Sequence, residues 1–156
     1  MTAPVPTVRV DPPGVKLDDG YQTLITFAAD ADVDLWEKSV TPPGIEGGDA
    51  VETTTMHNEI YRTMNPRSLF TLTDMTTTCA WDPVFYTQAL ALINVKTTVT
   101  VTFPNGDTLA FFGFLKNFTP GELVEGTQPT ATVTIVATNQ DPTTGVEEAP
   151  VLTVAV

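Results

Sequence analysis

Val95-Lys-Thr-Thr-Val-Thr-Val-Thr-Phe-Pro-Asn-Gly-Asp107 is the stretch of the chain that decides the fold. Apolar and polar side chains alternate along its first nine residues, and a period of two places the two kinds on opposite faces of a β-strand. Val and Thr suit a pleated strand because β-branched side chains are stiff at χ1. Pro104-Asn-Gly-Asp107 is a strong hairpin signal, since Asn and Gly both tolerate positive φ angles. The stretch therefore predicts antiparallel β-structure that turns back at residues 104–107.

The segments on either side continue this pattern. Thr130–Thr138 alternates threonines with apolar residues, as a half-buried strand does. Leu109–Phe118 is apolar on both faces, with Phe112, Phe114 and Phe118 on one side, so a second sheet, a helix or a neighbouring subunit is expected to cover its outer face. Further strands are predicted at Gln22–Ala28, Asp34–Val40, Leu69–Ala80 and Val151–Val156.

One helix is predicted at residues 82–94. Asp82 is a favourable N-cap, and Pro83 suits the first helical position. Apolar residues follow at helical spacing, and Asn94 is a candidate for the end of the helix. The expected fold is mainly β: an antiparallel β-sandwich or barrel of two packed sheets with one flanking α-helix, a long loop and terminal arms.

The rest of the chain reads as loop. Residues 1–20 are rich in Pro, Gly and Asp and are predicted to form an N-terminal arm ahead of a β-domain at 21–156. Within that domain, residues 41–66 form a long polar loop and residues 139–156 a C-terminal arm. Long loops without structure are uncommon inside compact domains and are often functional or disordered.

The composition limits the classes of function that the chain can have. The 156 residues fit one domain, and the net charge of −12 comes from 19 acidic against 7 basic residues. Binding to nucleic acid phosphates needs clustered Lys and Arg, whereas the bases here are scattered apart from Arg62 and Arg67. The apolar runs are far shorter than the ~20 residues that cross a bilayer, so no membrane insertion of the subunit is expected.

The residues that could carry catalysis do not form a recognisable set. Cys79 and His57 are the single Cys and the single His, and they lie far apart in the sequence. One residue of each kind cannot make the usual zinc set either. Glu122 and Glu125 sit beside a Pro-Gly turn and are interpreted as surface charge. No catalytic residue, cofactor site or metal site is therefore predicted, and an enzyme is not expected.

Two further features could suggest a binding site, but neither indicates one. Asp30-Ala-Asp-Val-Asp34 has the opening spacing of a calcium loop, but Leu35 and Thr41 stand where that loop needs glycine and glutamate. Trp36 and Trp81 could stack on a base or a sugar, although core or interface packing is the ordinary use of such rings.

Several motifs in fixed order resemble the major tail tube proteins of bacteriophages with long non-contractile tails. The resemblance covers roughly residues 36–140. In the C-terminal half it rests on Val99-Thr-Val-Thr-Phe-Pro-Asn-Gly106, Phe111-Phe-Gly-Phe114, Thr119-Pro-Gly-Glu122 and Thr132-Val-Thr-Ile-Val-Ala-Thr-Asn139. In the middle it rests on Gly47-Gly-Asp49, Thr53-Thr-Thr-Met56, Arg62, Pro66 and Asp82-Pro83.

This resemblance implies a structural virion protein that forms hexameric rings. The rings would stack into a tail tube that conducts DNA into the host, and the subunit would be made in the host bacterial cytoplasm. Implied partners are further copies, the terminator, tape measure and distal tail proteins, and passing DNA that is not bound specifically. The implied self-assembly residues lie in the long loop: Gly47, Gly48, Asp49, Thr53, Thr54, Met56 and Arg62.

The surplus of acidic residues fits a tube, because a negative lumen repels the phosphates of passing DNA. Two other structural roles stay open at this point. A capsid-decorating or cell-surface β-sandwich would share the Thr-rich strands and the acidity but would not need a long loop for ring contacts. A tail terminator has a fold similar in kind and would cap the tube.

Overall fold

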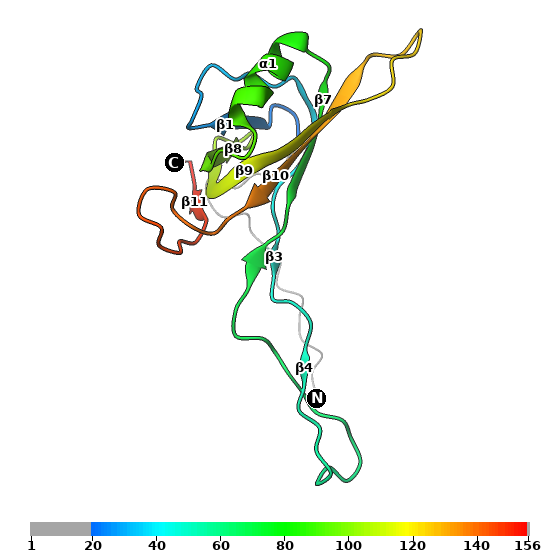
Figure 1. Ribbon diagram of the computed structural model, residues 1–156, viewed down its shortest axis with the longest axis vertical. Coiled ribbons are helices and arrows are strands. Elements are labelled where there is room, and N and C mark those ends of the chain that lie inside the picture. Colours follow the sequence, from blue (N-terminus) through cyan, green and yellow to red (C-terminus); the bar gives the residue numbers. More distant parts are fainter. Residues whose placement is uncertain (1–19, 156) are drawn as a thin grey trace, which may run out of the picture.

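A seven-stranded antiparallel sheet forms the body of the chain in a computed structural model, which describes residues 20–155 (Figure 1). The order along the sheet is β1-β8-β9-β10-β7-β2, and β11 pairs with β9 beside β10. The strands are β1 (Leu24–Phe27), β2 (Glu37–Thr41), β7 (Met75–Ala80), β8 (Thr97–Thr102), β9 (Thr108–Pro120), β10 (Thr130–Ala137) and β11 (Val151–Thr153). Residues 1–19, most of the predicted N-terminal arm, lie outside the described residues.

The sheet curls, and its two edge strands approach each other. The backbone N–H of Ile25 in β1 donates to Oε1 of Glu37 in β2 at 2.9 Å, so a side chain joins the edges where a backbone ladder would close a full barrel. Within the described residues one helix, α1 (Pro83–Leu92), flanks the sheet. The prediction of a mainly antiparallel β-fold of sandwich or barrel type with one helix is confirmed, and a single curled sheet supplies both of its packed layers.

The core fills the inside of the curl with side chains from alternate positions of each strand. In β8 the buried residues are Thr97, Val99 and Val101, and in β10 they are Ala131, Val133 and Ile135, so alternate positions face the core as the period-two patterns predict. Phe85, Ala89 and Leu92 of α1 are buried against this core.

A β-bulge in β9 changes the predicted side of one aromatic residue. Thr134 pairs with Asn117 while Ile135 pairs with Leu115, so Lys116 is an extra residue in β9. An extra residue shifts the alternation of side chains. Phe118 therefore lies on the core side, where its ring meets Phe85 at 4.9 Å between centroids, and it does not share a face with Phe112 and Phe114 as predicted.

The helix-start signal and the hairpin signal in the sequence are each followed by the element that they predict. The Val84 N–H donates to Oδ1 of Asp82 at 2.9 Å, so Asp82 caps α1, and the helix ends two residues before Asn94. β8 and β9 form the predicted hairpin, but Gly106 alone in its turn has positive φ, at 89°. The Gly106 N–H donates to the Phe103 carbonyl, so the loop is a turn with Pro104 at its second position followed by a left-handed glycine.

The C-terminal segment folds back onto the body, although residues 139–156 were predicted to form an arm. β11 pairs with Thr108–Ala110 of β9, and the Ala155 N–H donates to Oδ1 of Asp107 at 2.7 Å. Residues 108–110 of β9 lie beyond the end of β10, so this part of the β9 edge would otherwise have unpaired backbone groups. β11 forms hydrogen bonds with those groups.

Candidate self-assembly surface

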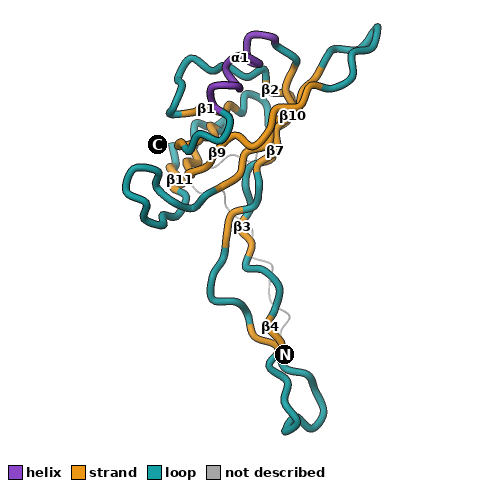
Figure 2. Tube along the Cα trace, in the orientation of Figure 1, coloured by secondary structure: helices purple, strands orange, loops and turns teal. Residues whose placement is uncertain are grey.

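An arm made of residues 42–74 projects away from the body (Figures 1 and 2). It is a two-stranded ribbon in which β3 (Ile45–Glu46) pairs with β6 (Thr71–Leu72), and β4 (Val51–Glu52) pairs with β5 (Met64–Asn65). The predicted long loop at 41–66 is therefore the outgoing strand and tip of a longer structured element. Residues 66–74 return to the body, so the predicted strand at Leu69–Ala80 is divided into β6 and β7.

Hydrogen bonds hold the tip of the arm, residues 53–63, in one shape. Thr53 and Thr63 are joined by a backbone bond of 2.8 Å and by their hydroxyl groups at 3.0 Å. The Thr63 N–H donates to the Thr54 hydroxyl at 2.9 Å. The side chains of threonine thus replace the ladder where the two strands separate.

The seven predicted self-assembly residues all lie in the arm. Gly47, Gly48 and Asp49 connect β3 to β4. Gly48 has a φ of 77°, and a Cβ there would stand 3.1 Å from Cδ of Arg67. That arginine reaches across the ribbon and donates from Nε to the Asp49 carbonyl at 2.8 Å. These residues therefore shape the middle of the arm.

The other four predicted residues lie at the tip. Thr53 and Thr54 stabilise it, whereas Met56 and Arg62 face solvent. Arg62 pairs with Glu52 at 3.7 Å, and both side chains are largely exposed, so the pair contributes little stability. Met56 is fully exposed.

The arm exposes many apolar side chains, of which sequence reasoning named only Met56. The arm segment is polar on average, and this concealed its other apolar residues. Their irregular spacing matches neither a helix nor a strand. The exposed apolar residues of the arm are Ile45, Val51, Met56, Ile60, Tyr61, Met64, Leu69 and Phe70.

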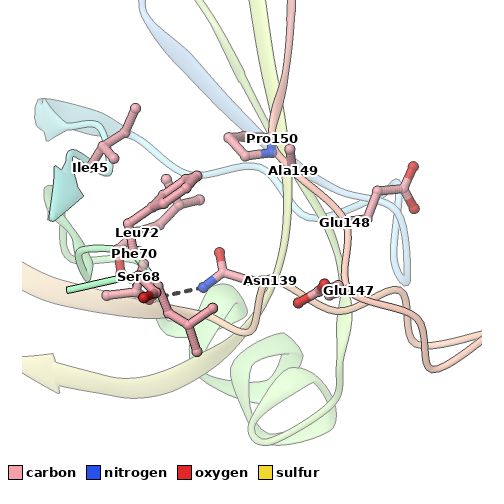
Figure 3. A pocket seen from close by; sticks show the side chains of 11 residues that line it. Ile45, Ser68, Phe70, Leu72, Asn139, Glu147, Glu148, Ala149 and Pro150 are labelled. Carbon is pink, nitrogen blue, oxygen red and sulfur yellow. Dashed lines mark hydrogen bonds between the residues drawn. The ribbon is translucent and has the colours of Figure 1, made fainter. Parts of the chain in front are cut away.

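A pocket of about 380 Å³ lies at the root of the arm, and it is called the root pocket below (Figure 3). One wall comes from Ile45 and residues 68–72, and the other comes from residues 147–150. Asn139 lies between the walls and donates from Nδ2 to the Thr71 hydroxyl at 2.9 Å, which fixes the arm to the loop after β10. Figure 3 shows Phe70 and Leu72 on the arm side and Glu147 on the opposite side.

The outer face of α1 is a second apolar surface. The ten residues of α1 include no charged side chain, although a helix at a protein surface ordinarily has a polar face. Its exposed apolar residues are Val84, Tyr86 and Leu90, with Ile93 just beyond its end.

Threonines line the outer faces of β7, β8 and β10, and Phe112 and Phe114 of β9 lie between those of β8 and those of β10. Thr76 and Thr78 of β7 stand opposite Thr134 and Thr132 of β10, and these threonines alternate with buried residues. The group of Thr76, Thr78, Thr98, Thr100, Thr102, Thr132 and Thr134 is called the threonine face. It offers hydroxyl groups without charge.

Cys79 and His57, the residues that could carry catalysis, lie in different parts of the molecule. Cys79 is buried in β7, where burial, and then the nearby Glu37, raises the pKa of its thiol. His57 lies at the tip of the arm, within residues 53–63. No group of three His, Cys, Asp or Glu side chains in residues 20–155 is placed to hold a metal ion. Among those residues, no helix has the length and apolar character to cross a membrane.

The calcium-loop candidate and the two tryptophans make contacts within the fold. The Asp32 N–H donates to Oδ1 of Asp30 at 3.1 Å, which makes a local turn of the former calcium-loop candidate. The ring of Trp81 stacks on Phe118 at 5.7 Å. Trp36 is largely exposed and donates from Nε1 to Asp82 at 3.2 Å, so it braces the start of α1.

No protein-family model matches the chain, and no curated protein sequence matches it. Its fold is similar to that of a chain in the cryo-EM structure of the anti-feeding prophage (AFP) baseplate, which was six-fold symmetrised, with a TM-score of 0.57. The match covers 84% of this chain and 90% of that one at 7% identity, so it shows a shared fold and no more.

The crystal structure of the SPP1 Dit protein, titled a paradigm of the hub adsorption apparatus in Gram-positive infecting phages, also matches. Its TM-score is 0.47 at 11% identity, over 75% of this chain. The chain spans half the length of that protein.

Proposed function

We propose that the chain is a structural protein of a phage tail, whose copies form hexameric rings that stack into the tail tube. The arm is the observation that carries the proposal. It holds apolar side chains away from the body, where residues 20–155 leave them exposed. Burying one large apolar side chain contributes about 1.5–3 kcal/mol, so a partner surface gains most from contact with the arm. Extended apolar surfaces of this kind are typical of interaction sites.

The body supplies a second contact for the ring. Copies with a net charge of −12 repel each other, and the repulsion is smallest where they meet through uncharged surface. The outer face of α1 is such a surface and is apolar. The similarity of the fold to a chain from a six-fold symmetrised baseplate supports a ring of six.

The threonine face suits the wall of the lumen. It can hydrogen-bond water and carries few bases that would hold phosphates, so DNA passes without specific binding. Acidic residues elsewhere on each copy add a repulsive field over the whole tube. In this role the chain needs no catalytic group and no cofactor. Its further partners would be the terminator, tape measure and distal tail proteins of the virion tail.

A baseplate ring is the second candidate function, and the AFP baseplate match favours it. A baseplate subunit would use the same arm to contact one neighbouring ring and would not repeat along an axis. The two functions therefore differ in whether rings of this chain stack on themselves.

Negative-stain electron microscopy of the concentrated purified protein tests the proposal. Hollow filaments with six-fold symmetry in end views are the expected result. Single hexameric rings at every concentration would select the baseplate function. Particles that stay solitary at high concentration would overturn both, and would favour a capsid-decorating role.

A further inference from the structure

We propose that the tip of the arm on one copy inserts into the root pocket of the next copy, with Arg62 paired to Glu147. The proposal rests on the proposed self-assembly and names the site that receives the arm. Its basis is that the pocket and the tip match in apolar character and in charge.

The root pocket is an apolar hollow with an acidic wall. Ile45, Leu69 and Phe70 line it while remaining largely exposed, so their apolar surface is not covered by the described part of the chain. Glu147 and Glu148 stand on the other wall, and neither forms an ion pair within residues 20–155. Figure 3 shows Glu148 pointing away from the hollow, which leaves Glu147 as the acid that an incoming group meets.

The tip of the arm offers the complementary set. Met56, Ile60 and Tyr61 are each at least 78% exposed, and hydrogen bonds between Thr53, Thr54 and Thr63 hold the backbone that carries them. A preordered tip loses less conformational entropy on insertion than a flexible loop does.

Arg62 follows these apolar residues directly. Its local pair with Glu52 is long and exposed and is therefore easily exchanged for Glu147. In a partly desolvated pocket, a charge-assisted hydrogen bond is stronger than it is at the open surface.

Charge distinguishes the arm tip from the other protrusion of the molecule. The hairpin between β9 and β10 also exposes apolar residues, Leu123 and Val124, at residues 121–127. That turn carries Glu122 and Glu125 and no base, so Glu147 would repel it. The arm tip carries one acid, Glu59, and one base, Arg62, so it is the protrusion that brings a cation to the pocket.

The contact must form between copies. The root pocket lies where the arm joins the body, and the tip lies at the far end of the same arm (Figures 1 and 2). A tip that fills the pocket of the next copy makes a heterologous contact, which repeats without closing when the copies are displaced along the arm. From Ile45 to His57, extended chain at about 3.3 Å per residue spans on the order of 40 Å. Stacked rings joined in this way should repeat at about that distance.

Disulfide trapping between two variants tests the contact. Met56→Cys protein is mixed with Phe70→Cys protein and oxidised gently; the native Cys79 is buried and does not interfere. A cross-linked heterodimer that contains both cysteines is expected. Met56→Cys mixed with Thr127→Cys, on the exposed β9–β10 hairpin, is the matched control and should remain uncoupled.

A charge exchange tests the ion pair. Arg62→Glu should prevent filament formation, and adding Glu147→Arg to the same chain should restore it. Glu52→Gln, which removes only the local pair of Arg62, should form filaments normally. Circular dichroism of each variant checks that the body is folded.

The outcomes separate this contact from the proposed function. If unaltered protein forms filaments but no Met56–Phe70 heterodimer is trapped, the tip–pocket contact is wrong and the tube function stands. If the heterodimer is trapped but no filaments or stacked rings form, the contact stands and the tube function fails. Solitary protein with no trapped heterodimer overturns both.

Discussion

Thr77 is a polar residue whose hydroxyl group has no hydrogen-bond partner in the core. It points inward from β7, it is 1% exposed, and no donor or acceptor in the described residues contacts its Oγ1. A buried polar group without a partner costs stability, whereas an apolar group of the same shape does not. Thr77→Val should therefore raise the free energy of unfolding by about 1 kcal/mol, measured by urea denaturation. Thr76→Val on the exposed face of the same strand is the control and should give no such gain; a loss at position 77 would contradict the assignment.

Glu37 gives the fold a pH dependence. Burial raises the pKa of its carboxyl group, although hydrogen bonds from its own backbone and from the Ile25 N–H lower it, and Asp34 raises it further. The folded chain therefore keeps a proton on Glu37 at pH values where the unfolded chain has lost it. Stability falls as the pH rises from about 4.3, the ordinary pKa of Glu, through the raised value.

Glu37→Gln should remove that part of the pH dependence. Glutamine keeps an oxygen that can accept from Ile25 and cannot ionise. The melting temperature of the variant should fall less than that of the unaltered chain between pH 4 and pH 7, measured by differential scanning calorimetry. Glu46→Gln, an exposed position in the arm, controls for the change in net charge. Parallel curves for the Glu37→Gln variant and the unaltered chain would show that Glu37 does not contribute to the pH dependence.

At the scale of elements, the sequence predicted the features that interactions between neighbouring residues determine. Asp82 and Pro83 fixed the start of α1, and the alternation at Val99 and Val101 fixed the buried face of β8. The arm could not be predicted in the same way, because β3 to β6 are two residues each and owe their pairing to partners across the ribbon. The bulge at Lys116 was equally hidden, since an extra residue shows only against the register of the neighbouring strand.

The arm beyond β3 and β6 should be dispensable for folding. Leu72 in β6 is buried, so a truncation has to keep the β3–β6 pair. Replacing residues 47–70 by a two-residue Asn-Gly turn between the paired residues Glu46 and Thr71 removes β4, β5 and the tip, none of which contributes to the core. Circular dichroism and the urea midpoint should be nearly unchanged, while filaments should disappear from micrographs.

A milder variant separates the shape of the arm from its chemistry. Met56, Ile60 and Tyr61 are all changed to Ser in a chain of full length. Loss of filaments here as well would assign assembly to the apolar tip. Filaments that persist in both variants would show that the arm is not an assembly element.

At the scale of the whole molecule, charge and architecture agree on one arrangement. Acidic residues outnumber basic ones by 19 to 7, yet the outer face of α1, proposed for contact within the ring, and the threonine face, proposed for the lumen, consist of uncharged side chains. A protein that bound DNA tightly would need the reverse distribution. Repetition around a ring and along a tube multiplies whatever charge the lumen wall carries.

Adding cations to the threonine face should therefore slow DNA passage without preventing assembly. Thr76→Lys and Thr132→Lys together place ammonium groups on exposed positions of β7 and β10, outside the arm and α1. Virions built with this variant should show tails of normal length and slower DNA release, measured with a DNA-binding dye after triggered ejection. Because the attraction involves counterion release, high salt should restore the rate. Thr143→Lys in the exposed loop before β11 is the control of the same charge type. Ejection at the normal rate in low salt would show that the threonine face does not line the path of the DNA.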